Sequence, residues 1–287
     1  MAKISGGRPA GPFKREEAMG EVPSGVIAAD TVTRPTDAWK GAVLVAGSHG
    51  GIYAAYCAVK AGVRGVILND AGRGKDDAGI GGIGYCEALG IPYATIATLS
   101  ARIGNGGDMI ERGVISATNR IAERLGVRPG LPCAEAAALM TAAGLSTAPV
   151  MPYAEARSEL QPGPSGRRVI LLDSISLVGP SDVGQVLVSG SHGAILGIEK
   201  AAALKIDGYA AFFNDAGGGA DDAGFTRLPA LDERGIAAGT VAAMSARIGD
   251  ARSSYDSGVL SRVNDTAHRL GGAEGMTLKA FCDLLVA

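Results

Sequence analysis

Short apolar runs alternate with segments of helical character along the first half of the chain. The apolar runs end at glycine or polar residues, as buried strands do, and cover residues 26–30, 41–46, 65–68 and 92–99. The helical segments cover residues 52–61, 78–89, 108–125 and 134–143. Strands that alternate with helices predict a mainly parallel sheet with helices on both faces. On the helix expected at 108–125, Ser116 and Asn119 would share one face and pack inside the protein or between its two halves.

The second half of the chain repeats this pattern, and a series of polar motifs recurs in it in the same order. The recurring pairs are Gly47-Ser48-His49-Gly50 with Gly190-Ser191-His192-Gly193, Asn69-Asp70-Ala71-Gly72 with Asn214-Asp215-Ala216-Gly217, Asp76-Asp77-Ala78-Gly79 with Asp221-Asp222-Ala223-Gly224, and Ser100-Ala101-Arg102-Ile103-Gly104 with Ser245-Ala246-Arg247-Ile248-Gly249. The spacing between the copies grows by two residues after the Ser-His motif, which indicates an insertion in the intervening helix. An internal tandem duplication is the simplest explanation of the repeat.

We therefore predict an α/β protein made of two tandem Rossmann-like lobes with mainly parallel sheets, related by a pseudo-twofold axis. The first repeat covers residues 26–145 and the second covers residues 169–287. Residues 1–25, rich in glycine, proline and charge, would form an N-terminal arm. Residues 146–168, with four prolines, would form the linker.

The charges of the 287-residue chain are few and mixed in sign, with a net charge of −2. Such a surface makes nucleic acid an unexpected partner. The longest uncharged run, residues 41–59, is broken by the Gly-Ser-His-Gly-Gly turn, and the start of the chain has no apolar core. We therefore expect no membrane span and no secretory signal, but a cytoplasmic protein that forms a homo-oligomer. The four cysteines have no metal-type spacing and are expected to be reduced thiols.

Polar side chains follow the expected strands in both halves, at the points where the strands end. Ligands of open parallel sheets bind at the carboxyl ends of the strands, so we expect these side chains to gather around a site. They are Asp30, Ser48, His49, Asn69, Asp70, Ser100 and Arg102 in the first half, and Asp173, Ser191, His192, Asn214, Asp215, Ser245 and Arg247 in the second.

The string Ala46-Gly47-Ser48-His49-Gly50-Gly51 resembles the nucleophile elbow of α/β-hydrolases, in which a tight turn between strand and helix exposes a serine. The resemblance implies that Ser48 and Ser191 act as nucleophiles or help to stabilise an oxyanion. The Ser-His-Gly turn is also similar to the turn that carries the catalytic histidine of caspase-type peptidases. That family has a cysteine at the end of the next strand, where this chain has Asn69-Asp70 and Asn214-Asp215, so peptidase activity of that kind is not expected.

The residue types at the strand ends predict acid–base chemistry on a small anionic molecule. His49 and His192 would be general acids or bases near neutral pH, each oriented by an aspartate of the next strand end, Asp70 or Asp215. The substrate would be held by the arginines, which suit carboxylate or phosphate, and by neighbouring polar groups: Arg102, Arg247, Asn69, Asn214, Ser100, Ser245, Asp30 and Asp173. In the structural alternative, His49 only caps the helix that follows and bonds a loop carbonyl.

The aspartate pairs Asp76-Asp77 and Asp221-Asp222 admit three interpretations. Aspartate is favoured at helix starts, and each pair precedes an expected helix. Alternatively, the pairs ligate a divalent metal together with Asp70 or His49, or they supply a catalytic acid. The glycine loop Gly72-Arg73-Gly74 fits no nucleotide-binding pattern, and no other cofactor is predicted.

The favoured hypothesis is a small-molecule enzyme that hydrolyses an amide- or ester-like bond in an anionic substrate. An isomerase or lyase that acts next to a carboxylate would use the same residues, and a non-catalytic module that binds a small anion is the third alternative. The two copies cannot be chemically identical, because Arg73 corresponds to Gly218 and Gly51 corresponds to Ala194.

Overall fold

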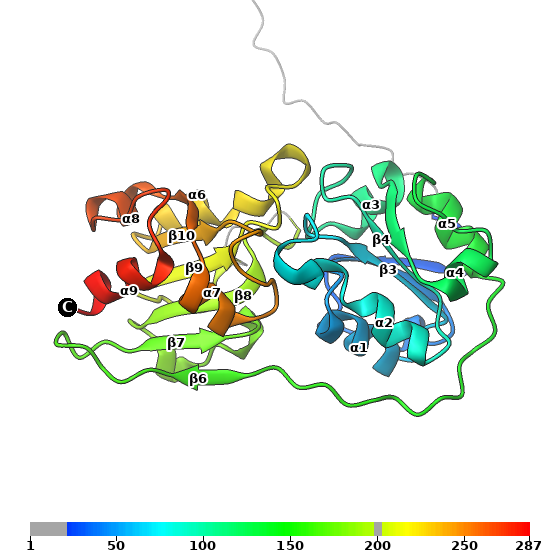
Figure 1. The fold of residues 1–287 in the computed structure, drawn as a ribbon, viewed down its shortest axis with the longest axis horizontal. Coiled ribbons are helices and arrows are strands. Elements are labelled where there is room, and N and C mark those ends of the chain that lie inside the picture. Colours follow the sequence, from blue (N-terminus) through cyan, green and yellow to red (C-terminus); the bar gives the residue numbers. More distant parts are fainter. Residues whose placement is uncertain (1–21, 198–202) are drawn as a thin grey trace, which may run out of the picture.

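The computed structural model describes residues 22–197 and 203–287 of the chain. The chain forms two α/β lobes that lie side by side, and the segment that joins them runs along one side of the molecule (Figure 1). Most of the arm predicted at residues 1–25, and part of the segment after the second Ser-His motif, lie outside the described residues. The described helices are too short or too polar to cross a membrane.

The first lobe is built on a sheet whose strands lie in sequence order, β1-β2-β3-β4-β5. These strands are β1 (Val26–Ala29), β2 (Val43–His49), β3 (Gly65–Asn69), β4 (Tyr93–Ile96) and β5 (Ile115–Thr118). The first four are parallel, and β5 pairs with β4 in the antiparallel direction. A Rossmann sheet reverses its strand order at the ligand site, and this sheet does not. The α/β class and the mainly parallel sheet are confirmed, whereas the Rossmann-like order is not.

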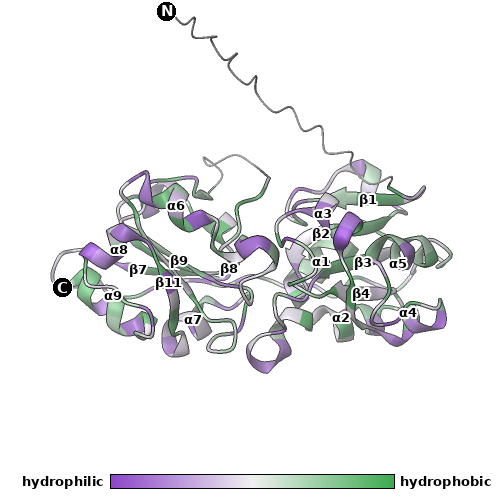
Figure 2. Ribbon diagram, turned by 90° about the horizontal axis from the view of Figure 1, so that it is seen from above, coloured by the Kyte–Doolittle hydropathy of each residue, from purple (hydrophilic) through white to green (hydrophobic). Residues whose placement is uncertain are grey.

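Helices cover both faces of the sheet, and successive side chains of a strand point to opposite faces, so the strands are buried on both sides. The helices are α1 (Ile52–Lys60) and α2 (Gly82–Ala88) on one face, and α3 (Gly106–Arg112), α4 (Arg120–Arg124) and α5 (Cys133–Met140) on the other. In β2, for example, Leu44 belongs to the core with α1, whereas Val45 belongs to the core with α3. Figure 2 shows the mainly hydrophobic strands at the centre of each lobe.

The single helix predicted at residues 108–125 is wrong, because α3, β5 and α4 share this segment. Gly113 ends α3 in an extended conformation, and a Cβ at this position would lie 2.3 Å from a backbone oxygen of α3. Ser116 therefore lies on a strand, where its Oγ is 3.0 Å from Oγ1 of Thr95. Asn119 caps α4 and does not share a helix face with Ser116. Both side chains stabilise the edge of the first sheet.

The second lobe has a sheet of order β11-β10-β9-β8-β7-β6, in which β7 to β10 are parallel and both edge strands are antiparallel. Its strands are β6 (Arg157–Glu159), β7 (Val169–Leu172), β8 (Val186–His192), β9 (Ala210–Asn214), β10 (Ala237–Val241) and β11 (Leu260–Val263). Its described helices are α6 (Arg227–Asp232), α7 (Ala251–Ser257), α8 (Asp265–Arg269) and α9 (Leu278–Val286). β6 comes from the segment predicted as a linker and extends the sheet by one strand.

The loops after β3 and β9 meet where the lobes touch, and we call this contact the lobe interface. Lys75 N donates to the carbonyl of Ala243 (2.9 Å), and Ala220 N donates to the carbonyl of Thr98 (2.8 Å). Each lobe thus contributes one donor and one acceptor at matching positions. Such reciprocal backbone bonds fix the orientation of the lobes.

The centre of the lobe interface is packed with glycines, alanines and two isoleucines. A Cβ at Gly72 would lie 3.0 Å from Cα of Gly217, and both residues have positive φ (+69° and +74°). The apolar cluster around them consists of Ala71, Ile103, Ala194, Ala216, Ala223 and Ile248. The Asn-Asp-Ala-Gly motifs therefore recur where the two lobes touch.

Candidate functional site

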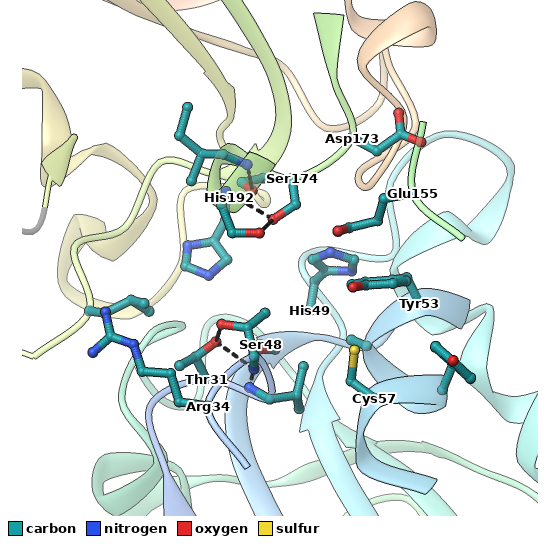
Figure 3. A pocket seen from close by; sticks show the side chains of 18 of the residues that line it. Thr31, Arg34, Ser48, His49, Tyr53, Cys57, Glu155, Asp173, Ser174 and His192 are labelled. Carbon is teal, nitrogen blue, oxygen red and sulfur yellow. Dashed lines mark hydrogen bonds between the residues drawn. The ribbon is translucent and has the colours of Figure 1, made fainter. Parts of the chain in front are cut away.

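A cavity of 560 Å³ lies between the lobes, beside the ends of β2 and β8. We call it the interlobe cavity; it is lined by the segments after β1 and β7, both Ser-His turns, α1 and the segment that joins the lobes. Its polar and titratable lining residues are Thr31, Thr33, Arg34, Ser48, His49, Tyr53, Tyr56, Cys57, Lys60, Glu155, Asp173, Ser174, Ser176, Ser191, His192, Lys205 and Arg227. Figure 3 shows that both predicted histidines project into this region.

The imidazole rings of His49 and His192 are held in the same way. Nδ1 of His49 accepts a hydrogen bond from Gly51 N, and Nδ1 of His192 accepts one from Ala194 N, both at 3.2 Å. A ring nitrogen that accepts a bond from a backbone N–H carries a lone pair, so the proton of the neutral ring is on Nε2. Each ring therefore presents an Nε2–H donor, and its local bond goes to a backbone amide, not to a loop carbonyl.

Both histidines are neutral at physiological pH. Burial lowers the pKa of His49 to about 4. The pKa of His192 is lowered well below the usual range, first by burial and then by the charges of Arg227 and His49. A neutral imidazole with a proton on Nε2 cannot accept a proton at that atom, but it can donate a hydrogen bond to a carbonyl or carboxylate.

Each histidine ring lies against a glycine of the opposite lobe. A Cβ at Gly249 would lie 3.2 Å from Cε1 of His49, and a Cβ at Gly104 would lie 3.7 Å from Cε1 of His192. These glycines have φ of +80° and +87° and end the two Ser-Ala-Arg-Ile-Gly motifs. The repeated motif thus completes the histidine site of the other lobe, so the site depends on the lobe interface.

The serines of the Ser-His turns line the cavity, but their hydroxyls already serve the backbone. Ser48 Oγ accepts from Val32 N at 3.1 Å, and Ser191 Oγ accepts from Ile175 N at 3.0 Å. Within the described residues, no hydrogen bond joins either serine to a histidine. The paired hydroxyls Thr31–Thr33 (2.9 Å) and Ser174–Ser176 (2.8 Å) lie in the segments that these serines hold.

Glu155, in the segment that joins the lobes, is the titratable group best matched to proton transfer near neutral pH. Its pKa is raised to about 7, mainly by burial and further by the charge of Asp173, while contacts with Tyr53 and Ser174 oppose the rise. Its carboxyl group contacts Tyr53, and Figure 3 shows it in the cavity that His49 also lines. Glu155 is not among the residues predicted from the sequence, because a lone carboxylate in a proline-rich segment without a counterpart in the first repeat gives no signal.

A buried cation, Arg227 at the start of α6, lies behind the second histidine. Only 3% of its surface is exposed; its Nε donates to the carbonyl of Ala194 (3.0 Å), and a second nitrogen donates to the carbonyl of Ala203. The guanidinium also lies over the ring of Phe213 at 4.9 Å, and burial lowers its pKa to about 10. Among the described residues it has no carboxylate partner. Three further cations line the cavity: Arg34, Lys60 and Lys205.

Several residues predicted for the site lie elsewhere and hold loops. Asp70 Oδ1 accepts from the backbone N–H groups of Gly72 and Thr98, both at 2.9 Å, and Asp215 makes the equivalent bonds in the second lobe. Asp30 accepts from Gly106 N at the start of α3 (3.2 Å). The other residues that bond to backbone groups of their own lobe are Asn69, Asn214, Ser100 and Ser245. Asp173 lines the cavity and also accepts from two backbone N–H groups.

The predicted anion clamps form ion pairs across the lobe interface. Arg102 Nε lies 2.9 Å from Oδ2 of Asp221, and Arg247 Nη1 lies 3.1 Å from Oδ2 of Asp76. The pairs have matching positions in the two lobes, and neither arginine lines the interlobe cavity. Each arginine also lies near an aspartate of its own lobe, with 2.8 Å between Arg247 and Asp250 and 3.9 Å between Arg102 and Asp108, so carboxylates of both lobes surround these charges.

The helix-cap interpretation of the aspartate pairs is wrong. Asp76 and Asp77 lie inside the short helical segment Lys75–Ile80 with φ of 56° and 54°, and they make no cap bond; the second pair, Asp221-Asp222, has the same conformation. Their carboxylates instead pair with arginines. Within residues 22–197 and 203–287, no three His, Cys, Asp or Glu side chains are placed to hold a metal ion.

Comparisons with models of protein families, with curated proteins and with solved structures gave no match for this chain.

Proposed function

We propose that the protein is an enzyme that moves a proton at a carbon next to a carbonyl group of a small anionic substrate, as an isomerase or a lyase does. One observation carries the proposal: a carboxyl group with a pKa of about 7, Glu155, shares a cation-lined cavity with neutral imidazole donors. A carboxylate base paired with a neutral histidine is a known arrangement for removing a proton next to a carbonyl.

In this mechanism Glu155 removes the proton, and His49 stabilises the charge that develops. The Nε2–H of His49 donates to the carbonyl oxygen, which becomes an enolate oxygen as the C–H bond breaks. Because the imidazole stays neutral and keeps its proton, its low pKa suits this role. When a double bond is conjugated with the enolate, Glu155 returns the proton to the γ-carbon, which shifts the double bond and gives isomerisation. When the β-carbon carries a leaving group, its bond to that group breaks as the enolate re-forms the carbonyl and a new C=C bond, and the group leaves with its electron pair, which gives elimination.

Serine-dependent hydrolysis, the favoured hypothesis from the sequence, has weaker support. A serine nucleophile needs a base within hydrogen-bond reach, and none of the described residues serves Ser48 or Ser191 in this way. Nδ1 of each histidine accepts a hydrogen bond from a backbone amide, so its lone pair is not available to a serine hydroxyl. We therefore place proton transfer first and hydrolysis second.

We also infer that the two lobes arose by tandem duplication. The support is the shared strand order, the shared hydrogen bonds of the aspartates and histidines, and the reciprocal ion pairs at matching positions. The interlobe cavity would then descend from two similar half-sites, of which one gained Glu155 and the other gained Arg227.

The test is hydrogen exchange in D₂O, followed by proton NMR, with a panel of short-chain keto, hydroxy and unsaturated carboxylic acids. We expect the protein to exchange or convert at least one of them, with kcat/KM rising with pH through about 7, because the base must be ionised. Glu155→Gln should lower the rate by about 10²–10⁴-fold. Glu159→Gln, a change in the same segment but outside the cavity, is the control.

Three results would contradict the proposal. Saturable binding without exchange or conversion would indicate a binding module. Equal activity of Glu155→Gln and the unchanged protein would show that Glu155 is not the base. If the double variant Ser48→Ala, Ser191→Ala folds but loses activity, the serines take part in the reaction and hydrolysis is favoured.

A further inference from the structure

The two lobes fill the space behind their histidines with different side chains. In the first lobe Gly82 leaves room for Tyr93, whose hydroxyl donates to the carbonyl of Gly50 at 2.7 Å; a Cβ at Gly82 would lie 2.6 Å from this hydroxyl. In the second lobe the corresponding residues are Arg227 and Ala238, so a guanidinium replaces the phenol. The matching backbone bonds, from Gly82 N and Arg227 N to the glycine after each histidine, confirm that the positions correspond.

The first lobe shows that a neutral tyrosine is enough to fill this space and bond the turn. A buried guanidinium without a counter-ion is unfavourable, because the protein interior solvates charge poorly. Arg227 has five N–H donors, two of its nitrogens bond to carbonyls, and it lines the cavity without a carboxylate partner among the described residues. An anionic group that enters the cavity would provide the missing charge.

We infer that Arg227 and the Nε2–H of His192 form a carboxylate-binding subsite, which holds the anionic group of the substrate while its carbonyl lies near His49 and Glu155. The position of the carbonyl group near His49 and Glu155 rests on the proposed function, whereas the carboxylate-binding subsite does not. Both donors come from the second lobe, and the planar guanidinium suits a carboxylate because it can bind both oxygens. The substrate class is then a short carboxylic acid that carries a carbonyl group.

The two histidines would therefore have different roles despite equal local geometry. His192 binds the anion in both the ground state and the transition state, so its loss should raise KM more than it lowers kcat. His49 acts on the developing enolate, so its loss should lower kcat. The surroundings of His192 are consistent with this division, since its pKa is lowered first by burial and then by the charge of Arg227.

The experiment measures binding of propionate, a carboxylate without a second carbonyl group, by calorimetry, with neutral propionamide as the matched probe. We expect saturable binding of propionate and at least tenfold weaker binding of propionamide. The double variant Arg227→Gly, Ala238→Tyr copies the first lobe and removes the cation without leaving a cavity. We expect it to fold, as judged by circular dichroism and Tm, and to bind propionate at least tenfold more weakly.

Further variants separate this inference from the proposed function. Propionate has no second carbonyl group, so its binding tests the subsite whether or not the protein catalyses proton transfer. Glu159→Gln, outside the cavity, should bind propionate as the unchanged protein does. Arg227→Lys keeps the charge but loses the planar fork, and it should bind propionate several-fold more weakly. Unchanged propionate binding in the double variant or in Arg227→Lys, equal binding of propionamide, or no propionate binding at all would overturn the subsite.

Discussion

The two lobes share a framework but differ in the side chains that face the interlobe cavity. Around His49 the first lobe provides Tyr53, with Glu155 brought in from the joining segment. The second lobe has Leu196 where the first has Tyr53, and it has Arg227 behind His192. Apart from the two histidines, the repeated polar residues mainly hold turns and the lobe interface, whereas the unrepeated Glu155 and Arg227 bring a carboxyl group and a guanidinium to the cavity. The differences between the copies therefore distinguish two cavity histidines that the shared motif leaves alike.

Among substitutions of repeated residues, the largest expected effect comes from replacing the histidine of the first lobe in two ways. Glutamine can place an amide N–H close to the position of Nε2–H, whereas alanine removes the donor. If His49 acts as a neutral donor, His49→Ala should lower kcat by about 10²–10³-fold, and His49→Gln should recover much of the loss. Steady-state kinetics on the substrate found by the exchange assay would measure both values.

The same pair of substitutions at His192 is the internal comparison. We expect His192→Ala to raise KM with a smaller change in kcat, and His192→Gln to restore binding. Equal losses of kcat in the alanine and glutamine variants of His49 would mean that this histidine transfers a proton, against the assignment of its proton to Nε2.

The glycines that touch the histidines across the lobe interface give the next effect. Gly249→Ala places a methyl group near His49 in a left-handed backbone conformation, which costs about 1–3 kcal/mol of stability, and the push on the ring should also lower kcat. Gly130→Ala is the matched control, because Gly130 has φ of +91° with no atom within 4 Å of an added Cβ. Chemical denaturation and kinetics on both variants separate backbone strain from displacement of the ring.

Gly104→Ala extends this comparison to the second histidine. Its Cβ would lie 2.9 Å from the carbonyl oxygen of Ile195 and farther from His192, so the stability loss should exceed the kinetic effect. A normal kcat in Gly249→Ala would show that contact between the lobes does not position His49.

The sequence predicted most of the fold, because buried strands and glycine turns leave strong local signals. It failed at residues 108–125, where an antiparallel strand lies between two short helices. The length of β5 is only four residues, and its pairing with β4 is a tertiary feature that local periodicity does not contain. The strand order within the sheets likewise depends on long-range pairing.

For the candidate site, the sequence located the Ser-His turns at the cavity but misjudged which partners reach them. Asp70 and Arg102 follow strand ends, yet backbone amides and the opposite lobe take up their charges. Recurrence in both copies indicated importance without distinguishing a structural from a catalytic role. Glu155 and Arg227 reach the cavity through the packing of the lobes, so the sequence gives no sign that they line it.

The smallest effect is expected for Arg102 and Arg247, the arginines that the sequence predicts as anion clamps. Both are about half exposed and lie on the ion pairs of the lobe interface, away from the cavity. Exposed ion pairs contribute little, so the double variant Arg102→Gln, Arg247→Gln should lower Tm by no more than about 4 °C, and the loss should shrink in high salt. Propionate affinity and KM should stay unchanged, as in the surface control Arg120→Gln. A tenfold rise in KM would instead make these arginines part of the anion site and would erase the contrast between repeated framework residues and unrepeated functional ones.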